Sequence, residues 1–570
     1  MAAPMSDRPV LWSIAGNDSG GGAGLSADAR AAEGCAVHLC PVVASITAQN
    51  SLGVARVVPV AAEVLDAQLA ALAADLRPSV IKTGLIGSAE GVAVLMRWLA
   101  RFDAEGGPRV RLVVDPVLGA SAGGAAFCDD ALLAAYRERL LPRADLITPN
   151  RREAARLLGV ADAATRAEVP AQAAALRALG VGAVAITGGD SADGAADRTD
   201  ALDWIDTPLA RGWLALPRLD ARHTHGTGCT FATSAAAAMA RGFVTADALV
   251  LAKMATTAAI AAGHAAGQGA GPVGFDAGFA GDARRLPRLA CDETPPGPVV
   301  VPPERWPGGL YAISDSFAQA APLLAAAAEV PGLCALQLRI KRAAHRGLDD
   351  AAFAEALQVQ IGQAQAAIAA LPAERRPVLV INDHHALVLD AIEAGRLDAA
   401  SIALHLGQED MLALGAAGRA RLAAAQARGL RLGLSSHSLW ELARATALQP
   451  AYVACGPVWA TTTKDMPWTP QGLHNLGWWA RMAPVPVVGI GGVLDEAQVE
   501  AVMAAGAADV CLVRALAAQP GDADPAAAQR ERLVRMAAAC QRGREPSAAL
   551  AAPLWPRASL DPAAETGIAA

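Results

Sequence analysis

The chain has 570 residues, which is too long for one ordinary domain and predicts at least two. Hydrophobic residues make up 53% of it and charged residues 18%, a balance that supports folded cores and excludes a mostly disordered chain. The net charge of −7 excludes a strongly basic nucleic-acid-binding protein. The sequence shows no apolar run of membrane-spanning length, no signal-peptide pattern and no CxxC pair among its cysteines, so we expect a cytoplasmic protein.

A proline-rich segment, Thr294–Gly309, predicts a semi-rigid linker near the middle of the chain. The stretches on either side each have the size of a single domain, and the Ala- and Pro-rich C-terminus predicts a flexible tail. The predicted organisation is a first domain over residues 1–285, a linker over 286–308, a second domain over 309–540 and a tail over 541–570.

Short apolar runs alternate with helical stretches in the first domain. This alternation predicts an α/β domain with a mainly parallel sheet and helices on both faces. Helices are predicted over Glu63–Leu76 and Asp130–Leu140. The predicted strands are Val10–Ile14, Val113–Val114, Leu146–Ile147 and Val184–Ile186.

Polar residues and glycines follow several of these strands. The glycine-rich loop Ala15–Gly24 would let the backbone approach a ligand, although a plain strand–helix turn explains it as well. Asp115 follows a strand at the sheet edge where α/β domains bind ligands. Asn150 and Glu153 share one helical turn, which suits a hydrated Mg²⁺ or, equally well, a helix cap.

The strongest candidate site of this domain is the segment Thr224–Thr230, THGTGCT, which leads into an Ala-rich helix. Gly226 and Gly228 would let the backbone curl so that several N–H groups face one anion, and the helix dipole adds to that field. At this electropositive position we expect the pKa of the Cys229 thiol to be lowered. A buried, inert cysteine is the alternative, but the place of Cys229 inside the glycine loop favours a functional role.

These motifs, taken in order over about residues 9–275, resemble the hydroxymethylpyrimidine/phosphomethylpyrimidine kinases of thiamine biosynthesis, which have a ribokinase-like fold. The motifs are VLWSIAGNDSGGGAGLSAD, SITAQNSLGV, IKTGLIG, VVDPVLG, LITPNRREA, ITGGD and THGTGCT. The resemblance implies that Cys229 lies at the hydroxyl that is phosphorylated. It implies a pyrimidine pocket lined by Gly16, Ala23, Asp28, Gln49 and Leu85. ATP and its phosphates are expected near Asp115, Asn150, Glu153, Thr187, Gly226 and Gly228.

Two positions depart from this family. Ser121 stands where the family commonly has a lysine, and Thr187 stands where a lysine often precedes Gly188-Gly189. Both changes would alter contacts to phosphate groups. The departures keep open a degenerate first domain that only binds its ligand, and a kinase of the same superfamily for another substrate, such as pyridoxal, is a separate alternative.

Eight apolar runs follow the linker, mostly separated by helical segments rich in Ala, Leu and Arg. Eight β/α units in this length predict a closed (β/α)₈ barrel, with a doubly wound open sheet as the alternative. The predicted strands are Leu310–Ser314, Leu333–Leu338, Val378–Ile381, Ser401–His405, Leu430–Leu434, Tyr452–Cys455, Val487–Ile490 and Val510–Val513.

Polar side chains gather at the carboxyl ends of these strands, where such barrels carry their active sites. Alternation along the second strand puts Gln337, Arg339 and Lys341 on one face, and an amide with two cations suits a pyrophosphate. Asp383 and Asp410 would project from neighbouring strand ends as oxygen ligands for Mg²⁺. Further polar or glycine residues follow the last three strands: Thr461, Thr463, Lys464, Gly491 and Arg514.

Over about residues 309–535 the motifs QLRIK, INDHH, HLGQED, GLSSHS, GPVWATTTK and VVGIGGV resemble thiamine-phosphate synthases. The resemblance implies a magnesium site at Asp383 and Asp410, and catalytic roles for Ser435 and Lys464. Contacts to the pyrimidine diphosphate are implied for Gln337, Arg339, Lys341, Asn382, Ser435 and Lys464. Contacts to the thiazole phosphate are implied for Thr461, Thr463, Gly491, Val513 and Arg514, the last replacing a common serine. We do not expect the related thiazole tautomerase barrel to carry both the QED acid and the TxTK motif.

Together the motifs predict a bifunctional thiamine-biosynthesis enzyme that uses ATP as co-substrate and Mg²⁺ as cofactor. Its expected partners are small-molecule substrates rather than nucleic acid or membrane, and the sequence leaves a homo-oligomer open. A non-catalytic sensor of thiamine precursors, with one domain degenerate, is the alternative from another class. Only four of the 48 basic residues are lysines, which marks them as places that need a compact ammonium: Lys82, Lys253, Lys341 and Lys464.

Overall fold

The structure, a computed structural model, describes residues 8–119, 128–161, 165–189, 199–298, 306–461, 467–519, 521–546, 549–551 and 553–566. The chain forms two compact units. The first consists of Met1–Gly297 together with Leu560–Ala570, and the second of Pro298–Ser559. The chain therefore passes between the units twice, once after Gly297 and once after Ser559. No helix among the described residues is long and apolar enough to cross a membrane.

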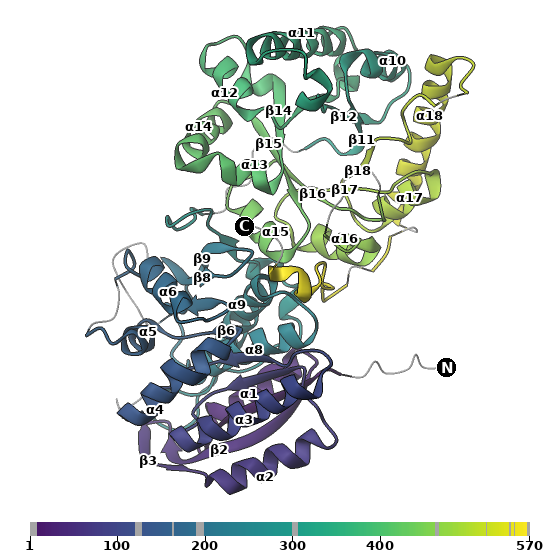
Figure 1. Ribbon diagram of the computed structural model, residues 1–570. Helices are drawn as coiled ribbons and strands as arrows, with labels where there is room; N and C mark the ends of the chain where they lie inside the picture. Colours follow the sequence, from purple (N-terminus) through teal and green to yellow (C-terminus); the bar gives the residue numbers. More distant parts are fainter. Residues whose placement is uncertain are drawn as a thin grey trace, which may run out of the picture. The chain divides into compact units, whose positions relative to one another are not determined.

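The first unit is built on a ten-stranded sheet (Figure 1). Its strands are β1 (Val10–Asp18), β2 (His38–Asn50), β3 (Gly53–Pro59), β4 (Val80–Thr83), β5 (Arg111–Val114), β6 (Leu146–Ile147), β7 (Val184–Ile186), β8 (Asp200–Asp206), β9 (Arg211–Pro217) and β10 (Arg288–Leu289). They lie in the order β10-β9-β8-β7-β6-β5-β4-β1-β2-β3. The middle of the sheet, from β2 to β7, is parallel, and the outer strands pair antiparallel. The predicted mainly parallel α/β sheet is confirmed.

Helices cover both faces of this sheet. One face carries α1 (Gly24–Gly34), α8 (Thr227–Ala240) and α9 (Thr245–Ala261), which pack on one another. The other face carries α2 (Ala62–Ala73), α3 (Ala89–Glu105), α4 (Asp130–Ala135), α5 (Arg151–Leu158) and α6 (Val169–Ala178). The helix predicted over residues 130–140 is α4 continued by a π-helical turn, Tyr136–Leu140.

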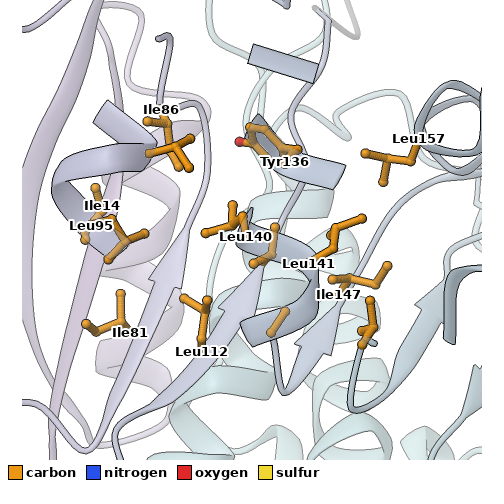
Figure 2. Packing of buried hydrophobic residues seen from close by; sticks show 14 of the residues in the cluster. Ile14, Ile81, Ile86, Leu95, Leu112, Tyr136, Leu140, Leu141, Ile147 and Leu157 are labelled. Atoms are coloured by element: carbon orange, nitrogen blue, oxygen red, sulfur yellow. The ribbon is translucent and has the colours of Figure 1, made fainter. Parts of the chain in front are cut away.

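The core of the first unit lies between the sheet and the second of these helix layers. Figure 2 shows the contact between sheet residues such as Ile14 and Leu112 and helix residues such as Leu95 and Leu157. The central strands are buried on both faces, so their residues are apolar in continuous runs rather than in alternation. This pattern is why a short apolar run such as Val113–Val114 is readable as part of a strand from the sequence.

The second unit is a closed barrel of eight parallel strands. Its strands are β11 (Gly309–Ser314), β12 (Leu333–Leu338), β13 (Val378–Asn382), β14 (Ile402–Leu406), β15 (Arg431–Ser436), β16 (Tyr452–Cys455), β17 (Val487–Ile490) and β18 (Asp509–Leu512). Parallel pairing of β11 with β18 closes the ring. The predicted (β/α)₈ barrel is therefore confirmed, and the open-sheet alternative is wrong.

Helices surround this barrel (Figure 1), namely α10 (Phe317–Ala327), α11 (Asp350–Ala369), α12 (His385–Glu393), α13 (Gln408–Ala413), α14 (Gly415–Ala427), α15 (Leu439–Thr446), α16 (Gly472–Met482), α17 (Glu496–Ala504) and α18 (Pro525–Gly543). Aromatic rings fill the interior: Trp306 lies 4.3 Å from Tyr452 and 6.2 Å from Tyr311, measured between ring centroids. The buried carboxylate of Asp509 accepts hydrogen bonds from the Trp306 indole and from the N–H of Gly309, at the amino-terminal end of the strands.

Two segments differ from the organisation that the sequence predicts. The linker is predicted to begin at 286, but residues 288–289 form the edge strand β10, and the Trp213 indole donates to the carbonyl of Glu293. The tail is predicted to be flexible from 541, but the Arg557 N–H donates to Asn475 and the Thr245 N–H to the carboxylate of Glu565. These contacts join residues far apart in the chain, which local composition does not reveal.

Candidate active sites

A buried ionic cluster lies beneath the glycine-rich loops of the first unit. The Lys82 ammonium, on β4, is 3.0 Å from both carboxylate oxygens of Asp28, on α1. Asp28 also accepts hydrogen bonds from Ser13, on β1, at 2.6 Å and from Thr233, on α8, at 2.7 Å. All four side chains are fully buried. These contacts use the acceptor positions of Asp28 within the protein, so this residue holds four elements together.

Asp115 follows β5 and faces the same ammonium. Its Oδ2 atom lies 3.6 Å from the Lys82 nitrogen and has no hydrogen-bond partner in the described part of the chain. The side chain is almost entirely buried, and burial raises its pKa to about 6, against the opposing effect of the Lys82 charge. Asp115 is therefore a carboxylate that can exchange a proton near neutral pH.

Cys229 lies in the first turn of α8, where the sequence predicts it. Burial raises the pKa of its thiol to about 12, because the positive charge of Lys82 offsets the loss of hydration only in part. The predicted lowering of this pKa is therefore wrong. The helix start is electropositive, but the carboxylates of Asp115 and Asp28 lie on the same side and also disfavour a thiolate. The side chain of Cys229 is only partly buried at the surface, and the direction of this shift favours the neutral thiol.

The segment Thr224–Thr230, which leads into α8, is in direct contact with the glycine-rich loop Ala15–Gly24. Gly226 precedes α8 with a φ of 87°, and a Cβ atom there would lie 2.3 Å from the carbonyl oxygen of Gly22. His225 lies 3.1 Å from Asp18 and 3.2 Å from Gln49. Asp18 also accepts hydrogen bonds from the backbone N–H groups of Gly20, Gly22 and Ala23. Only glycine allows this close approach of the two loops.

Burial alone would raise the pKa of Asp18, but hydrogen bonds from His225 and from the backbone hold it below its usual range. Asp18 and His225 face a cavity of about 220 Å³ with Asn50, Ser51 and Pro272. Neither residue is among those predicted from the sequence, although both lie within motifs that carry the resemblance to a kinase family.

The predicted pyrimidine-pocket residues lie close to this loop contact. A Cβ atom on Gly16 would be 3.2 Å from the Leu85 side chain, so these two residues touch. Ala23 precedes α1, and Gln49 accepts a hydrogen bond from Thr47 while contacting His225. The structure thus brings Gly16, Ala23, Gln49 and Leu85 to the carboxyl end of β1. Asp28 lies deeper, without an acceptor position left for a ligand.

Three of the predicted nucleotide residues, Asn150, Glu153 and Thr187, lie at the carboxyl ends of β6 and β7. Asn150 and Glu153 form a capping box at the start of α5, with both hydrogen bonds at 2.9 Å, which is the helix cap that the sequence leaves open. Asn150 forms a β-bridge with Thr187. Ser121 lies outside the described residues.

Lys253 supports the turn that follows Thr187. Its ammonium, on α9, lies 2.7 Å from Asp203, and the other oxygen of Asp203 accepts the N–H of Gly188 at 3.0 Å. Lysine and aspartate are both buried. This rare lysine therefore holds backbone in place and does not face a ligand.

In the barrel, three of the residues predicted to bind the pyrimidine diphosphate lie at the carboxyl end of β12. Gln337 is buried within the strand, whereas the strand ends at Leu338, before Arg339 and Lys341. The charge of Arg339 contributes to lowering the pKa of His405, so Arg339 faces the barrel opening. Lys341 is exposed at the start of a 3₁₀ turn. The prediction that alternate residues share one face of the strand thus holds for Gln337 and Arg339 and not for Lys341. Thr463 and Lys464 lie outside the described residues.

Asp383 and Asp410 lie side by side. Burial and the neighbouring negative charge of Asp410 raise the pKa of Asp383. Asp410, in the first turn of α13, accepts the N–H of Gly407 at 3.1 Å. Two adjacent carboxylates suit a divalent cation that keeps waters and binds substrate phosphates, as Mg²⁺ does. Among the described residues, no group of three or more His, Cys, Asp or Glu side chains is placed to hold a metal.

The remaining predicted residues follow β16, β17 and β18 at the same end of the barrel. Gly491 has a φ of 97°, and a Cβ atom there would lie 2.6 Å from the Cα atom of Pro457. Val513 and the exposed Arg514 follow β18, and Thr461 follows β16. Asn382 ends β13 and is buried. The loops after strands seven and eight are the recurrent phosphate site of such barrels.

Comparison with known proteins assigns both units. The model of the phosphomethylpyrimidine kinase family matches residues 18–274, and that of thiamine monophosphate synthase matches 310–516. A hydroxymethylpyrimidine/phosphomethylpyrimidine kinase of Streptomyces coelicolor is 40% identical over 271 residues, covering 47% of this chain and 95% of the relative. A probable thiamine biosynthetic bifunctional enzyme of Oryza sativa, described as chloroplastic, is 31% identical over 497 residues, covering 85% of this chain and 81% of the relative.

The chain belongs to the bifunctional thiamine biosynthetic enzymes. It has a kinase domain followed by a thiamine-phosphate synthase domain, as its motifs predict. A thiamine biosynthesis bifunctional protein ThiED of Geobacter sulfurreducens is 36% identical over 271 residues, covering 48% of this chain and 53% of that relative. The matches to kinases and synthases favour the predicted function over the pyridoxal-kinase and sensor alternatives.

In the synthase domain, the predicted residue Ser435 belongs to a hydrogen-bonded set with His405 and Tyr452, which were not among the predicted site residues. His405 lies 3.0 Å from the Ser435 hydroxyl through Nε2 and 2.9 Å from the Tyr452 hydroxyl through Nδ1. Burial lowers the pKa of His405 to about 4, assisted by the charges of Arg339 and His437. Gln408 donates to the carbonyl of Ser435 at 2.7 Å. His405 is the first residue of the HLGQED motif, which was the available signal.

Proposed function

We propose that the kinase domain phosphorylates hydroxymethylpyrimidine and then its monophosphate with ATP, and that the synthase domain joins the resulting diphosphate to thiazole phosphate. The products are thiamine phosphate and pyrophosphate. The observation that supports the kinase proposal most directly is the position of Asp115 and Cys229 beside Lys82, under an anion-binding helix start. For the synthase it is the pair Asp383–Asp410 at the carboxyl end of the barrel.

In the kinase domain, the N–H groups at the start of α8 would bind the transferred phosphoryl group. Phosphoryl transfer needs mainly positioning and stabilisation of negative charge, which a helix start provides. The substrate hydroxyl must also lose a proton. Asp115 has a pKa of about 6 and an oxygen that accepts no hydrogen bond, although it lies near the Lys82 ammonium, whereas the pKa of Cys229 is raised. We therefore assign the proton to Asp115, and to Cys229 a neutral contact with the substrate.

In the synthase domain, Arg339 and Lys341 would bind the diphosphate, and Lys464 would contact the departing pyrophosphate. A Mg²⁺ ion held by Asp383 and Asp410 would neutralise negative charge on that leaving group. Departure of pyrophosphate leaves a pyrimidinylmethyl cation, which the thiazole nitrogen captures. The glycine turn at Gly491 would place the thiazole phosphate for this attack.

The test is incubation of the full chain with hydroxymethylpyrimidine, thiazole phosphate and Mg·ATP, followed by identification of the products. Thiamine phosphate, pyrophosphate and ADP are expected. Omission of ATP should abolish product unless pyrimidine diphosphate is supplied, which separates the two activities. Formation of pyridoxal phosphate from pyridoxal at a higher rate than pyrimidine phosphate would overturn the proposed kinase substrate.

A further inference from the structure

Five side chains form one continuous hydrogen-bonded chain through the interior of the barrel. The amide nitrogen of Gln337 lies 2.9 Å from the Tyr311 hydroxyl, which lies 2.8 Å from the Tyr452 hydroxyl. Tyr452 lies 2.9 Å from Nδ1 of His405, and Nε2 of His405 lies 3.0 Å from the Ser435 hydroxyl. Both ends, Gln337 and Ser435, are residues for which the resemblance to thiamine-phosphate synthases implies contacts to the diphosphate.

With the Gln337 amide in the orientation that the structure gives it, the hydrogens of this chain can be placed by counting donors. The amide of Gln337 donates to the Tyr311 oxygen, so the single Tyr311 hydrogen is left for Tyr452. The Tyr452 hydrogen then has His405 Nδ1 as its acceptor. A neutral His405 therefore carries its hydrogen on Nε2 and donates it to the Ser435 oxygen.

The opposite direction would leave a hydroxyl hydrogen unpaired. If His405 carried its hydrogen on Nδ1, Tyr452 would have to donate to Tyr311, and the Tyr311 hydrogen would find no acceptor. An imidazolium at His405 has the same consequence. Tyr311 and Tyr452 are almost completely buried, and an unpaired hydroxyl there would be costly.

The position of Tyr452 depends on a glycine in the neighbouring strand. A Cβ atom on Gly433, in β15, would lie 2.1 Å from the Tyr452 ring carbon that carries the hydroxyl. Glycine at 433 therefore lets the ring reach across the barrel to His405 and Tyr311. The Tyr452 ring stacks on the His405 ring with centroids 5.7 Å apart, which fixes the plane of the imidazole.

We propose that Tyr452 and His405 are positioning residues that force the Ser435 hydroxyl to donate its hydrogen toward the diphosphate. Because Ser435 accepts from His405, its own hydrogen points away from the ring, toward a ligand that can only accept. The site is thereby specific for an ionised phosphate oxygen at this position and opposes a ligand that presents a hydroxyl or amino hydrogen. This inference rests on the proposed contact between Ser435 and the diphosphate.

The first experiment observes the direction of the chain without any activity measurement. The full chain is labelled with ¹⁵N-histidine, and long-range ¹⁵N–¹H spectra give the tautomer of each ring, with the signal of His405 assigned from a His405→Gln variant. We expect His405 to be neutral with its hydrogen on Nε2 at pH 7. A hydrogen on Nδ1, or an imidazolium, overturns the proposal whatever the enzyme does. In Tyr452→Phe the ring should lose its single tautomer.

The second experiment asks whether Tyr452 acts through Ser435. Synthase kcat/KM is measured on supplied pyrimidine diphosphate for Tyr452→Phe, Ser435→Ala and the double variant. Tyr452→Phe should lower it about tenfold, the effect of losing a residue that orients a ligand-contacting group. The double variant should be no slower than Ser435→Ala alone, because the two act as one unit. Independent, multiplicative losses overturn the positioning role.

Tyr136→Phe is the matched control, since it removes the one tyrosine hydroxyl of the kinase domain, 3.4 Å from the carbonyl of Gly84. It should leave synthase kcat/KM unchanged. If Ser435→Ala has normal synthase activity, the proposed diphosphate contact fails, while the tautomer of His405 still decides the direction of the chain.

Discussion

Replacing Lys82 by methionine should move the acid limb of the kinase pH profile to higher pH. The Lys82 ammonium lies 3.6 Å from Asp115, and at an effective dielectric constant of about 20 the interaction amounts to about 5 kcal/mol, or between three and four pKa units. Part of this shift is lost, because water and side chains that fill the place of the ammonium screen the remaining charges. We therefore expect the limb to move from about pH 6 to between about pH 7 and 9.

The assay is kinase kcat on hydroxymethylpyrimidine between pH 5 and 10. Asp28→Asn is the matched variant, because the negative charge of Asp28 raises the pKa of Asp115 and its removal should shift the limb to lower pH. Both variants break the same buried contact and lose stability, so opposite shifts cannot come from destabilisation. An acid limb that stays near pH 6 in Lys82→Met would refute the assignment of the proton to Asp115.

Three further outcomes are expected. Cys229→Ala should lower kinase turnover roughly tenfold or more and leave synthase activity on supplied diphosphate unchanged; near-normal kinase turnover would remove Cys229 from the mechanism. In the unchanged chain, the Cys229 thiol should react only slowly with iodoacetamide at pH 8, because its pKa is raised to about 12. Lys464→Arg keeps the charge but not the compact ammonium, so synthase turnover should fall about a hundredfold, and retention of most of the rate would show that any cation suffices. Burial raises the pKa of Glu565 in the folded state, so its carboxylate opposes folding at any pH above 4.5, the pKa in the unfolded state. Glu565→Gln should therefore raise the Tm of the kinase domain at pH 7 and not at pH 4. Equal Tm shifts at both pH values would contradict this.

The eight strands of the barrel, and the end of the barrel at which functional residues lie, were predictable from the sequence. Runs such as residues 452–455 and 487–490 are apolar throughout, because both faces of a parallel strand are covered. The residues directly after such a run lie at the carboxyl edge, so Asp383 and Gly491 could be placed there from the sequence alone. Position along a strand was sufficient for these assignments.

The chemical state of the same residues was not predictable, because it depends on neighbours from other elements. The helix start predicts a low pKa for Cys229, but two carboxylates from α1 and the end of β5 face the same thiol. Sequence spacing likewise leaves Asn150 open between a ligand and a helix cap, and the distance to Glu153 shows the cap. The hydrogen-bond partners of Asp28 come from positions 13, 82 and 233, which no local pattern joins.

The buried charges argue for catalysis rather than for binding alone. A buried ion pair such as Lys82–Asp28 is rarely more stable than apolar residues of the same volume, so stability does not explain it. A protein that only binds its ligand needs groups whose charge stays constant near neutral pH. A carboxylate with a pKa close to 6 does not meet this need, because it gains and loses a proton in that range. Asp115 has this pKa because Lys82 offsets only part of the cost of its burial. A group tuned to gain and lose a proton beside the anion site is what phosphorylation of a hydroxyl requires, and a sensor would have no use for it.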